Sequence, residues 1–441
     1  MELFNRISSR TECVADCVHL NGLVDRTVAS GPHEQPIHIL EVDTIVSQYT
    51  EWLRYLPRVR QYYAIKSNDA DTVVDTITLL GAGFDCASLP EIERVIGLGV
   101  SPRSIIYAQP SKSIQSLGYI RNRGIRTVFD NEFELEKIAT HCPEAELLLR
   151  YRFDSTNVKV NLGTKFGCDP GQEAKDLLNL SRKLRLNVVG WCFNVGSMSS
   201  DATVFYDAIR IGRTISDYAT SIGFNFRVLD LGGGFIGDKD DNIARYAKHI
   251  NRALEEFFPD PSLEVFAEPG RYLCAAAVTN VCTVQGKRYI RTDGQIDTVG
   301  YYLNDGMYGT FYSAKYRGMV PNVLVWKASD RCDPKRKSKL FGPTCDGNDH
   351  FLDNVMLPEL DIGDILVFET QGAYAAVHSC RFNGFLLPKM ICYSRNSLME
   401  LLKVIAAVSP DDVKKTNEIL LSSEYLRSFV DRKMPLSFQQ K

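Results

Sequence analysis

Strand-like and helix-like segments alternate over the first two thirds of the sequence, and this alternation constrains the fold more than any other feature. Eight short apolar runs are separated by segments whose apolar residues recur at helical spacing. The runs lie at 61–67, 83–88, 104–110, 127–131, 145–153, 186–196, 226–235 and 263–268. Most are continuously apolar, as expected for parallel strands buried on both faces. Eight such units predict a (β/α)8 barrel of the TIM type, with an open doubly wound sheet as the alternative.

The pattern changes after about residue 275, where short strand-like runs separated by turn residues replace the helices. These runs predict a C-terminal all-β domain, a sandwich or a barrel, over residues 276–395. In this interpretation residues 37–275 form the barrel, and residues 1–36 join the β domain. Residues 396–441 carry helical patterns and are predicted to form a helical C-terminal tail.

Composition argues against several classes of protein. The formal net charge is −3, which gives no electrostatic footprint for nucleic acid. No segment approaches the roughly 18 apolar residues that a membrane span needs, and the first residues do not resemble a signal peptide. The 12 cysteines are scattered without a CxxC pair, so we expect no metal site. These features predict a cytoplasmic protein with reduced thiols.

Reactive residues recur where the predicted strands end, which is the rim at which barrel enzymes place their chemistry. They are Lys66, Asp85, Arg150, Asn194, Ser197, the glycines 232–234 and Glu268. Lys66 follows a buried run, and burial that lowers its pKa would make it a Schiff-base nucleophile. The alternative is a lysine that simply emerges at the end of a strand.

The glycines and the residues after the eighth strand suggest anion binding. Consecutive glycines let backbone amides approach a phosphate, although they also make tight turns. Arg271 follows a glycine just past a strand end, which suits an anion site. Glu268 on the same rim could keep a ring nitrogen protonated, or could form a structural ion pair with Arg271.

Several motifs together resemble those of the eukaryotic ornithine decarboxylases, which are fold-type III enzymes that use pyridoxal 5'-phosphate (PLP). They occur in the family's order at 63–69, 83–88, 229–235, 267–272, 301–309, 342–347, 372–374 and 382–385. The resemblance covers roughly residues 35–395, and the motifs are specific in combination. It implies an amino-acid decarboxylase with a PLP-binding barrel.

The resemblance also implies a role for each matched residue. Lys66 would form the Schiff base with PLP, Glu268 would pair with the pyridinium nitrogen, and Cys345 would protonate the α-carbon after carbon dioxide leaves. Other cofactor contacts would come from Asp85, Arg150, Ser197, Gly234, Gly270, Arg271 and Tyr374. Asp346 would bind the distal ammonium of the substrate. In this family Cys345 and Asp346 reach the site from the other subunit, which implies a homodimer with shared active sites.

Two positions depart from the family pattern. Asn194 stands where the family has a histidine that stacks on PLP, and the lost contact would cost about 0.5–1.5 kcal/mol. Tyr316 and Arg317 stand where the family has Tyr–Asp, whose aspartate contacts the substrate. An arginine there would repel an ammonium by roughly 4 kcal/mol at about 4 Å and an effective dielectric constant of about 20. Arg317 could instead pair with Asp346 or point to solvent.

Three functions therefore stay open. The first is decarboxylation of L-ornithine to putrescine and CO2, the first step of polyamine biosynthesis. The second is decarboxylation of a different amino acid without a distal cation. The third is a non-catalytic regulator like the antizyme inhibitors, since Lys112 and Lys137 lie in the segment that resembles the family's antizyme-binding surface. The Cys345–Asp346 pair favours a decarboxylase over an alanine-racemase-type reaction, and residues 420–441 lack the composition of the mammalian degradation tail.

Overall fold

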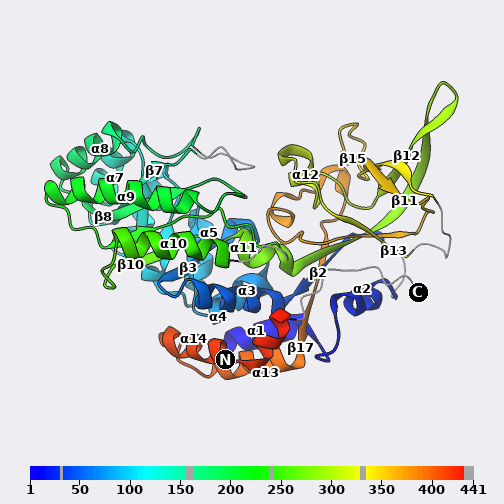
Figure 1. The fold of residues 1–441 in the computed structure, drawn as a ribbon, viewed down its shortest axis with the longest axis horizontal. Coiled ribbons are helices and arrows are strands. Elements are labelled where there is room, and N and C mark those ends of the chain that lie inside the picture. The colour runs from blue at the N-terminus through cyan, green and yellow to red at the C-terminus, as the bar shows by residue number, and fades with distance from the viewer. Residues whose placement is uncertain (30–32, 155–162, 239–242, 328–333, 432–441) are drawn as a thin grey trace.

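The computed structural model describes residues 1–29, 33–154, 163–238, 243–327 and 334–431. Two lobes lie side by side (Figure 1). One is a barrel surrounded by helices, and the other is built on a large sheet. Helices from both ends of the chain pack together beside the barrel.

A closed parallel barrel forms the first lobe, in the order β10-β3-β4-β5-β6-β7-β8-β9. Its strands are β3 (Val59–Ala64), β4 (Gly83–Cys86), β5 (Ile105–Tyr107), β6 (Arg126–Phe129), β7 (Glu146–Arg152), β8 (Asn187–Asn194), β9 (Val228–Asp230) and β10 (Glu264–Ala267). Closure is complete because Val265 of β10 pairs with Val59 of β3 on one side and Leu229 of β9 on the other. The predicted barrel is confirmed, and the open sheet is excluded.

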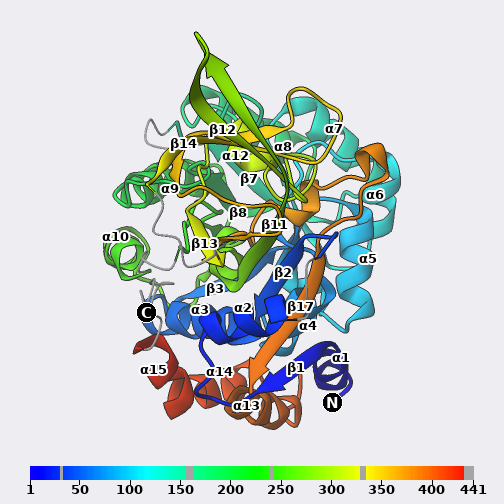
Figure 2. The same ribbon diagram turned by 90° about the vertical axis from the view of Figure 1, so that its right-hand side faces the viewer.

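Helices surround this barrel and bury their apolar faces against it. They are α3 (Val42–Tyr55), α4 (Asp71–Leu79), α5 (Leu89–Gly97), α6 (Ile114–Ile120), α7 (Glu132–His141), α8 (Gln172–Lys183), α9 (Val204–Ser221) and α10 (Ala244–Phe257). Ser88 and Asn131 each accept a backbone N–H in the first turn of α5 and α7, which fixes where these helices begin. In Figure 2, α5 and α6 cover one side of the barrel, and α9 and α10 cover the opposite side.

The second lobe is built on a nine-stranded sheet, in agreement with the predicted all-β domain. Its main path runs through β1 (Thr11–Val14), β17 (Lys389–Arg395), β2 (Ile37–Glu41), β11 (Val278–Thr292), β12 (Gln295–Leu303), β14 (Arg336–Phe341) and β15 (His350–Leu357). The strands β13 (Val323–Lys327) and β16 (Ile365–Phe368) attach through β11. The segment at 37–41, which the sequence pattern groups with the barrel, pairs in this sheet instead.

The two ends of the chain meet beside the sheet. The N-terminal segment contributes α1 (Glu2–Arg10), β1 and α2 (Leu20–Ala29), and the C-terminal one contributes α13 (Asn396–Ala406), α14 (Val413–Ser422) and α15 (Glu424–Asp431). Arg395 forms a buried ion pair with Glu41 at 2.7 Å, which joins β17 to β2. Residues 432–441 of the predicted tail lie outside the described residues. Within the described ranges, no helix is long and apolar enough to cross a membrane.

Candidate active site

Five charged residues meet at the carboxyl ends of the barrel strands. Lys66 follows β3, Asp85 lies on β4, Arg150 lies on β7, Asp230 ends β9 and Glu268 follows β10. Lys66 forms an ion pair with Asp85. The charges of Asp85, Lys66 and Arg150 all act on Glu268, which places these groups in one electrostatic cluster. Strands far apart in the sequence therefore build a single polar centre, as the strand-end pattern predicts.

Lys66 lies in a single 3₁₀ turn, Ile65–Ser67, rather than on the strand itself. Its partner Asp85 is completely buried. Burial alone would lower the pKa of Lys66, but the negative charges of Asp85 and Glu268 raise it above its ordinary value. The expectation that the pKa of Lys66 is lowered overall is therefore wrong, because two carboxylates stabilise the ammonium by more than burial destabilises it.

Glu268 and Asp230 are two buried carboxyl groups close enough to interact. Burial, followed by the charge of Asp85, raises the pKa of Glu268 to about 7. Burial and Glu268 raise the pKa of Asp230 well above its ordinary value, and Asp230 Oδ1 accepts the Gly232 N–H at 2.8 Å. Asp230 therefore holds a proton readily, and in that form it stabilises a negative charge on Glu268. Sequence reasoning missed Asp230, although an acidic residue that ends a buried strand was a usable signal.

Arg271 begins the short helix α11 (Arg271–Cys274) and is 9% exposed. Its Nε and Nη2 atoms are buried and have no hydrogen-bond partner in the structure. Its guanidinium carbon lies 5.1 Å from the centre of the Tyr374 ring. The Tyr374 N–H donates to Ser67 O at 2.8 Å, which holds this ring beside the Lys66 turn. Among the described residues, Glu268 does not pair with Arg271, so these guanidinium donors are available for an anion.

Two glycines allow the backbone to approach the region around Arg271 and Lys66 closely. Gly234 has φ +112°, and a Cβ there would lie 2.6 Å from Val195 Cγ2. A Cβ on Gly270 would lie 2.9 Å from Ser67 Cβ. The predicted phosphate contact Ser197 lies in the loop after β8, and two residues later Ser199 N donates to Gly234 O at 3.3 Å. Unpaired guanidinium donors beside a side-chain-free cradle fit the phosphate of PLP, and Lys66 beside them fits its aldehyde.

Asn194 ends β8 and stands where the family pattern has a histidine. Its side chain makes contacts that an aromatic ring would not make. Its Oδ1 accepts the Gly196 N–H at 2.9 Å. A Cβ on Gly233 would lie 3.6 Å from Asn194 Nδ2, so the amide also borders the glycine turn. The side chain therefore stabilises the loop that leads to Ser197 and lacks an aromatic face for stacking.

Cys345 and Asp346 lie on a loop of the β lobe. The Asp346 Oδ2 atom accepts from the Tyr308 hydroxyl at 2.7 Å, and Cys345 N donates to Asn383 Oδ1 at 2.9 Å. Hydrogen bonds from the Asn348 N–H and from Tyr308 lower the pKa of Asp346, which favours its ionised form. Across the described ranges, no hydrogen bond or ion pair joins this loop to Lys66. Within the described residues, the hydrogen bonds and ion pairs of one chain therefore do not join the two halves of the predicted site.

Arg317 ends the short helix α12 (Tyr312–Arg317), on the side of the β lobe nearest the barrel (Figure 1). Its guanidinium carbon lies 5.7 Å from the centre of the Tyr312 ring and 5.6 Å from that of Tyr374. It is half-buried, and within the described part of one chain it does not pair with Asp346. The neighbouring Tyr316 is 59% exposed, and its hydroxyl lies 3.8 Å from Met307 Sδ.

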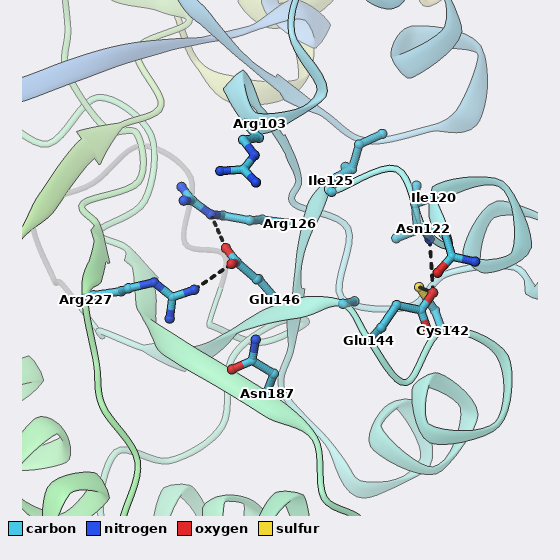
Figure 3. A pocket seen from close by; sticks show the side chains of 12 residues that line it. Arg103, Ile120, Asn122, Ile125, Arg126, Cys142, Glu144, Glu146, Asn187 and Arg227 are labelled. Atoms are coloured by element: carbon cyan, nitrogen blue, oxygen red, sulfur yellow. Dashed lines mark hydrogen bonds and ion pairs between the residues drawn. The ribbon is translucent and has the colours of Figure 1, made fainter.

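A separate pocket of about 320 Å³ opens at the amino ends of the barrel strands, opposite Lys66. Figure 3 shows Arg126 and Arg227 reaching toward Glu146 from two sides, with Arg103 beside them. Glu146 accepts from both arginines, at 2.9 Å from Arg126 Nε and 2.5 Å from Arg227 Nη2. These charges neutralise one another across neighbouring strands, so we interpret this pocket as part of the barrel's structure.

Lys112 and Lys137 lie on the barrel and share one carboxylate. Lys112 Nζ lies 2.9 Å from Glu134 Oε1, and Lys137 Nζ lies 2.6 Å from Glu134 Oε2. The Lys112 side chain has no exposed surface, and burial lowers its pKa to about 8. Lys137 keeps 26% of its side chain exposed. Of the two lysines, only Lys137 is accessible to a partner in this structure.

The carboxyl end of the barrel holds a lysine among carboxyl groups, beside a site that fits an anion. This arrangement is typical of a class of enzymes that bind a phosphorylated aldehyde. Residues 42–275 match the family model described as the pyridoxal-binding domain of pyridoxal-dependent decarboxylases. The chain therefore belongs to the pyridoxal-dependent decarboxylases, and it is an amino-acid decarboxylase with PLP as its cofactor.

Individual relatives agree with this assignment. The chain is 35% identical to ornithine decarboxylase of Rattus norvegicus over 391 residues, 86% of this chain and 85% of the relative. It is 38% identical to antizyme inhibitor 2 of Xenopus laevis over 358 residues, 79% of this chain and 78% of the relative. The structure of the Paramecium bursaria Chlorella virus arginine decarboxylase bound to agmatine superposes with a TM-score of 0.79 at 34% identity, covering 85% of this chain and 100% of that one. The resemblance to eukaryotic ornithine decarboxylases is thus confirmed.

Proposed function

We propose that this protein decarboxylates L-ornithine to putrescine and CO2, which is the first step of polyamine biosynthesis. The observation that carries the proposal is the carboxylate of Asp346. Hydrogen bonds from Tyr308 and Asn348 favour its ionised form, and it forms no ion pair in the described part of the chain. An ionised carboxylate is the group that would attract the distal ammonium of ornithine. The similarity to relatives named ornithine decarboxylase supports the same substrate.

The residues of the barrel rim would hold the cofactor in one orientation. In the proposal Lys66 binds the cofactor aldehyde, and Arg271, Gly234, Gly270, Ser197 and Tyr374 hold the phosphate. Glu268 accepts the pyridine N–H, while Asp85 and Arg150 fix the charges around it. Bound PLP supplies an electron sink for the electron pair left when carbon dioxide departs.

The protein residues then control protons and orientation. The positive charges of Lys66 and Arg150 and the hydrogen bond from Asp230 favour the ionised form of Glu268, which would let it hold a proton on the ring nitrogen. Asp346 holds the distal ammonium, which fixes the α-carboxylate on the other side of the substrate. The Cys345 thiol would deliver a proton to the α-carbon after carbon dioxide leaves, and Lys66 would be the residue that holds the cofactor aldehyde between turnovers.

The proposal includes a homodimer with two shared sites. Cys345 and Asp346 lie on the β lobe, and within the described part of one chain they form no hydrogen bond or ion pair with Lys66. Each catalytic centre would combine Lys66 of one subunit with Cys345 of the partner subunit. We also propose a cytoplasmic location, since the exposed Cys345 thiol has to stay reduced.

Release of CO2 from a panel of amino acids tests the proposed substrate. The purified protein with added PLP is given L-ornithine, L-lysine, L-arginine, L-glutamate and a neutral amino acid. We expect ornithine to give the highest kcat/KM and putrescine as product. Both Lys66→Ala and Cys345→Ala should reduce CO2 release at least about a hundredfold. A different preferred amino acid would contradict the substrate.

A regulatory role is the second candidate, because a relative named antizyme inhibitor 2 matches at 38% identity. In that role the chain would bind antizyme without catalysis. The same assay distinguishes the two, since a regulator would release no CO2 from any amino acid in the panel. A pull-down with antizyme tests the partner separately, and an enzyme that also binds antizyme would satisfy both measurements.

A further inference from the structure

Two guanidinium groups converge on one aromatic ring at the cofactor site. The carbon of the Arg271 guanidinium lies 5.1 Å from the centre of the Tyr374 ring, and that of Arg317 lies 5.6 Å from it. Arg271 comes from the barrel and Arg317 from α12 on the β lobe. The positive charge of Arg317 acts directly on Arg271 and is one of the causes that lower its pKa, after burial.

The position of Arg317 is determined by packing around α12. Tyr312, at the start of this helix, stacks on His378 with ring centres 4.7 Å apart. Ser313 Oγ donates to Tyr374 O at 3.2 Å. Two contacts therefore tie α12 to the segment that carries Tyr374. The Arg317 guanidinium then lies near the rings of Tyr312 and Tyr374.

One acidic charge, that of Asp238, acts on Arg271 and raises its pKa. Within the parts of the chain that the structure describes, no ion pair joins Arg271 or Arg317 to a carboxylate. Arg271 also keeps two buried nitrogens without a hydrogen-bond acceptor. Two like charges held close together are unfavourable when neither forms an ion pair, and a shared anion would relieve both the repulsion and the unmet hydrogen bonds.

We propose that Arg317 is a second phosphate-binding residue, which holds the cofactor phosphate together with Arg271 instead of contacting the substrate. A phosphate dianion offers several acceptor oxygens and can bind two guanidinium groups at once. The arginine then no longer opposes the distal ammonium, so Asp346 can act alone as the anchor. The extra phosphate contact also offsets the missing aromatic contact at Asn194.

Comparing PLP with pyridoxal, which lacks the phosphate, tests this role without any turnover. The cofactor is removed, and its rebinding is titrated by absorbance for the wild type, Arg317→Ala and Arg317→Lys. We expect Arg317→Ala to weaken PLP binding about tenfold or more. Pyridoxal binding should change less than about twofold, and Arg317→Lys should restore part of the affinity for PLP because it restores the charge.

Lys315→Ala is the matched control, because it removes one positive charge from the same helix. Lys315 Nζ contacts His350 Nε2 at 2.8 Å and not the Tyr374 ring. This variant should leave the ratio of PLP to pyridoxal affinity unchanged. An equal loss of affinity for PLP and pyridoxal in Arg317→Ala would overturn the proposal, because it would indicate a general disturbance of the site.

Unchanged PLP binding in Arg317→Ala, with an altered KM for amino acids, would also overturn the inference and would make Arg317 a substrate contact. The inference rests on the PLP chemistry of the proposed function but not on ornithine as the substrate. Since the affinity ratio is measured without an amino acid, failure of ornithine turnover and failure of the phosphate role are separate results.

Discussion

Glu268 and Asp230 are a pair of carboxyl groups whose protonation depends on their surroundings in the candidate site. Both are buried, and each lies at the end of a neighbouring barrel strand. Burial raises the pKa of both, so each carboxyl group takes up a proton more readily than it would in water. Lys66 and Arg150 supply the opposing positive charge. The state of Glu268 therefore depends on residues from four different strands or strand ends.

Glu268→Gln should alter the pH dependence of stability in the protein freed of cofactor. The pKa of Glu268 rises from 4.5 to about 7 on folding, so the folded chain takes up a proton between these pH values. Its contribution to the free energy of unfolding therefore falls as pH rises through this window. Glutamine does not titrate. The Tm of the variant minus that of the wild type should increase from below pH 4.5 to above pH 7, whereas a constant difference would contradict the assignment.

Lys112→Ala should destabilise the fold rather than only affect a partner. The substitution removes the donor to Val128 O at 2.7 Å and a buried partner of Glu134. Unmet buried groups of this kind cost about 1–3 kcal/mol each. Lys137→Ala removes a partly exposed pair and should cost less than about 1 kcal/mol. Denaturant unfolding measures both, and equal stability of the two variants would show that Lys112 is not buried in solution.

At the scale of single elements, the turns after the strands shape the candidate site more than the strands themselves do. The turn after β9 carries Gly232 at φ +62°, and a Cβ there would lie 2.0 Å from Phe193 O. The same turn leads to Gly234 in the anion cradle. A side chain at Gly232 would push β8 and β9 apart beside the place where the cofactor phosphate is proposed to lie.

Gly232→Ala should therefore lower both stability and PLP affinity. Gly294→Ala is a suitable control, because Gly294 has φ +80° but a Cβ there would meet nothing within 4 Å. The control isolates backbone strain, about 1–3 kcal/mol for a residue other than glycine. Gly232→Ala should lose more stability than Gly294→Ala, because its Cβ would also clash with the carbonyl oxygen of Phe193. Thermal unfolding and PLP titration measure the two effects, and equal losses in the two variants would contradict the clash.

The sequence predicts most of the barrel because burial on both faces leaves a strong apolar pattern. It also predicts that Lys66, Asp85 and Glu268 share a rim, since parallel strands end on the same side. It does not predict the direction of the Lys66 pKa shift, which depends on carboxylates brought in from other strands. The sequence also does not predict that Arg317 lies beside Tyr374, because this depends on how α12 packs against a segment distant in the sequence.

At the scale of the whole molecule, the candidate site residues lie on two different lobes. The barrel carries Lys66, Glu268 and Arg271, while the β lobe carries Cys345 and Asp346. The hydrogen bonds and ion pairs of a single chain do not join these sets within the described ranges. Two copies related by a two-fold axis would complete two equivalent sites, because such symmetry repeats every contact.

Mixing two inactive variants tests this account most directly. Lys66→Ala and Cys345→Ala are purified separately, mixed in equal amounts so that subunits exchange, and assayed for CO2 release from L-ornithine beside the wild type. Half of the dimers should be mixed, and each should contain one intact site, which predicts about a quarter of the wild-type activity. No activity in the exchanged mixture would contradict the shared site, and no release from ornithine by the wild type would contradict the proposed function.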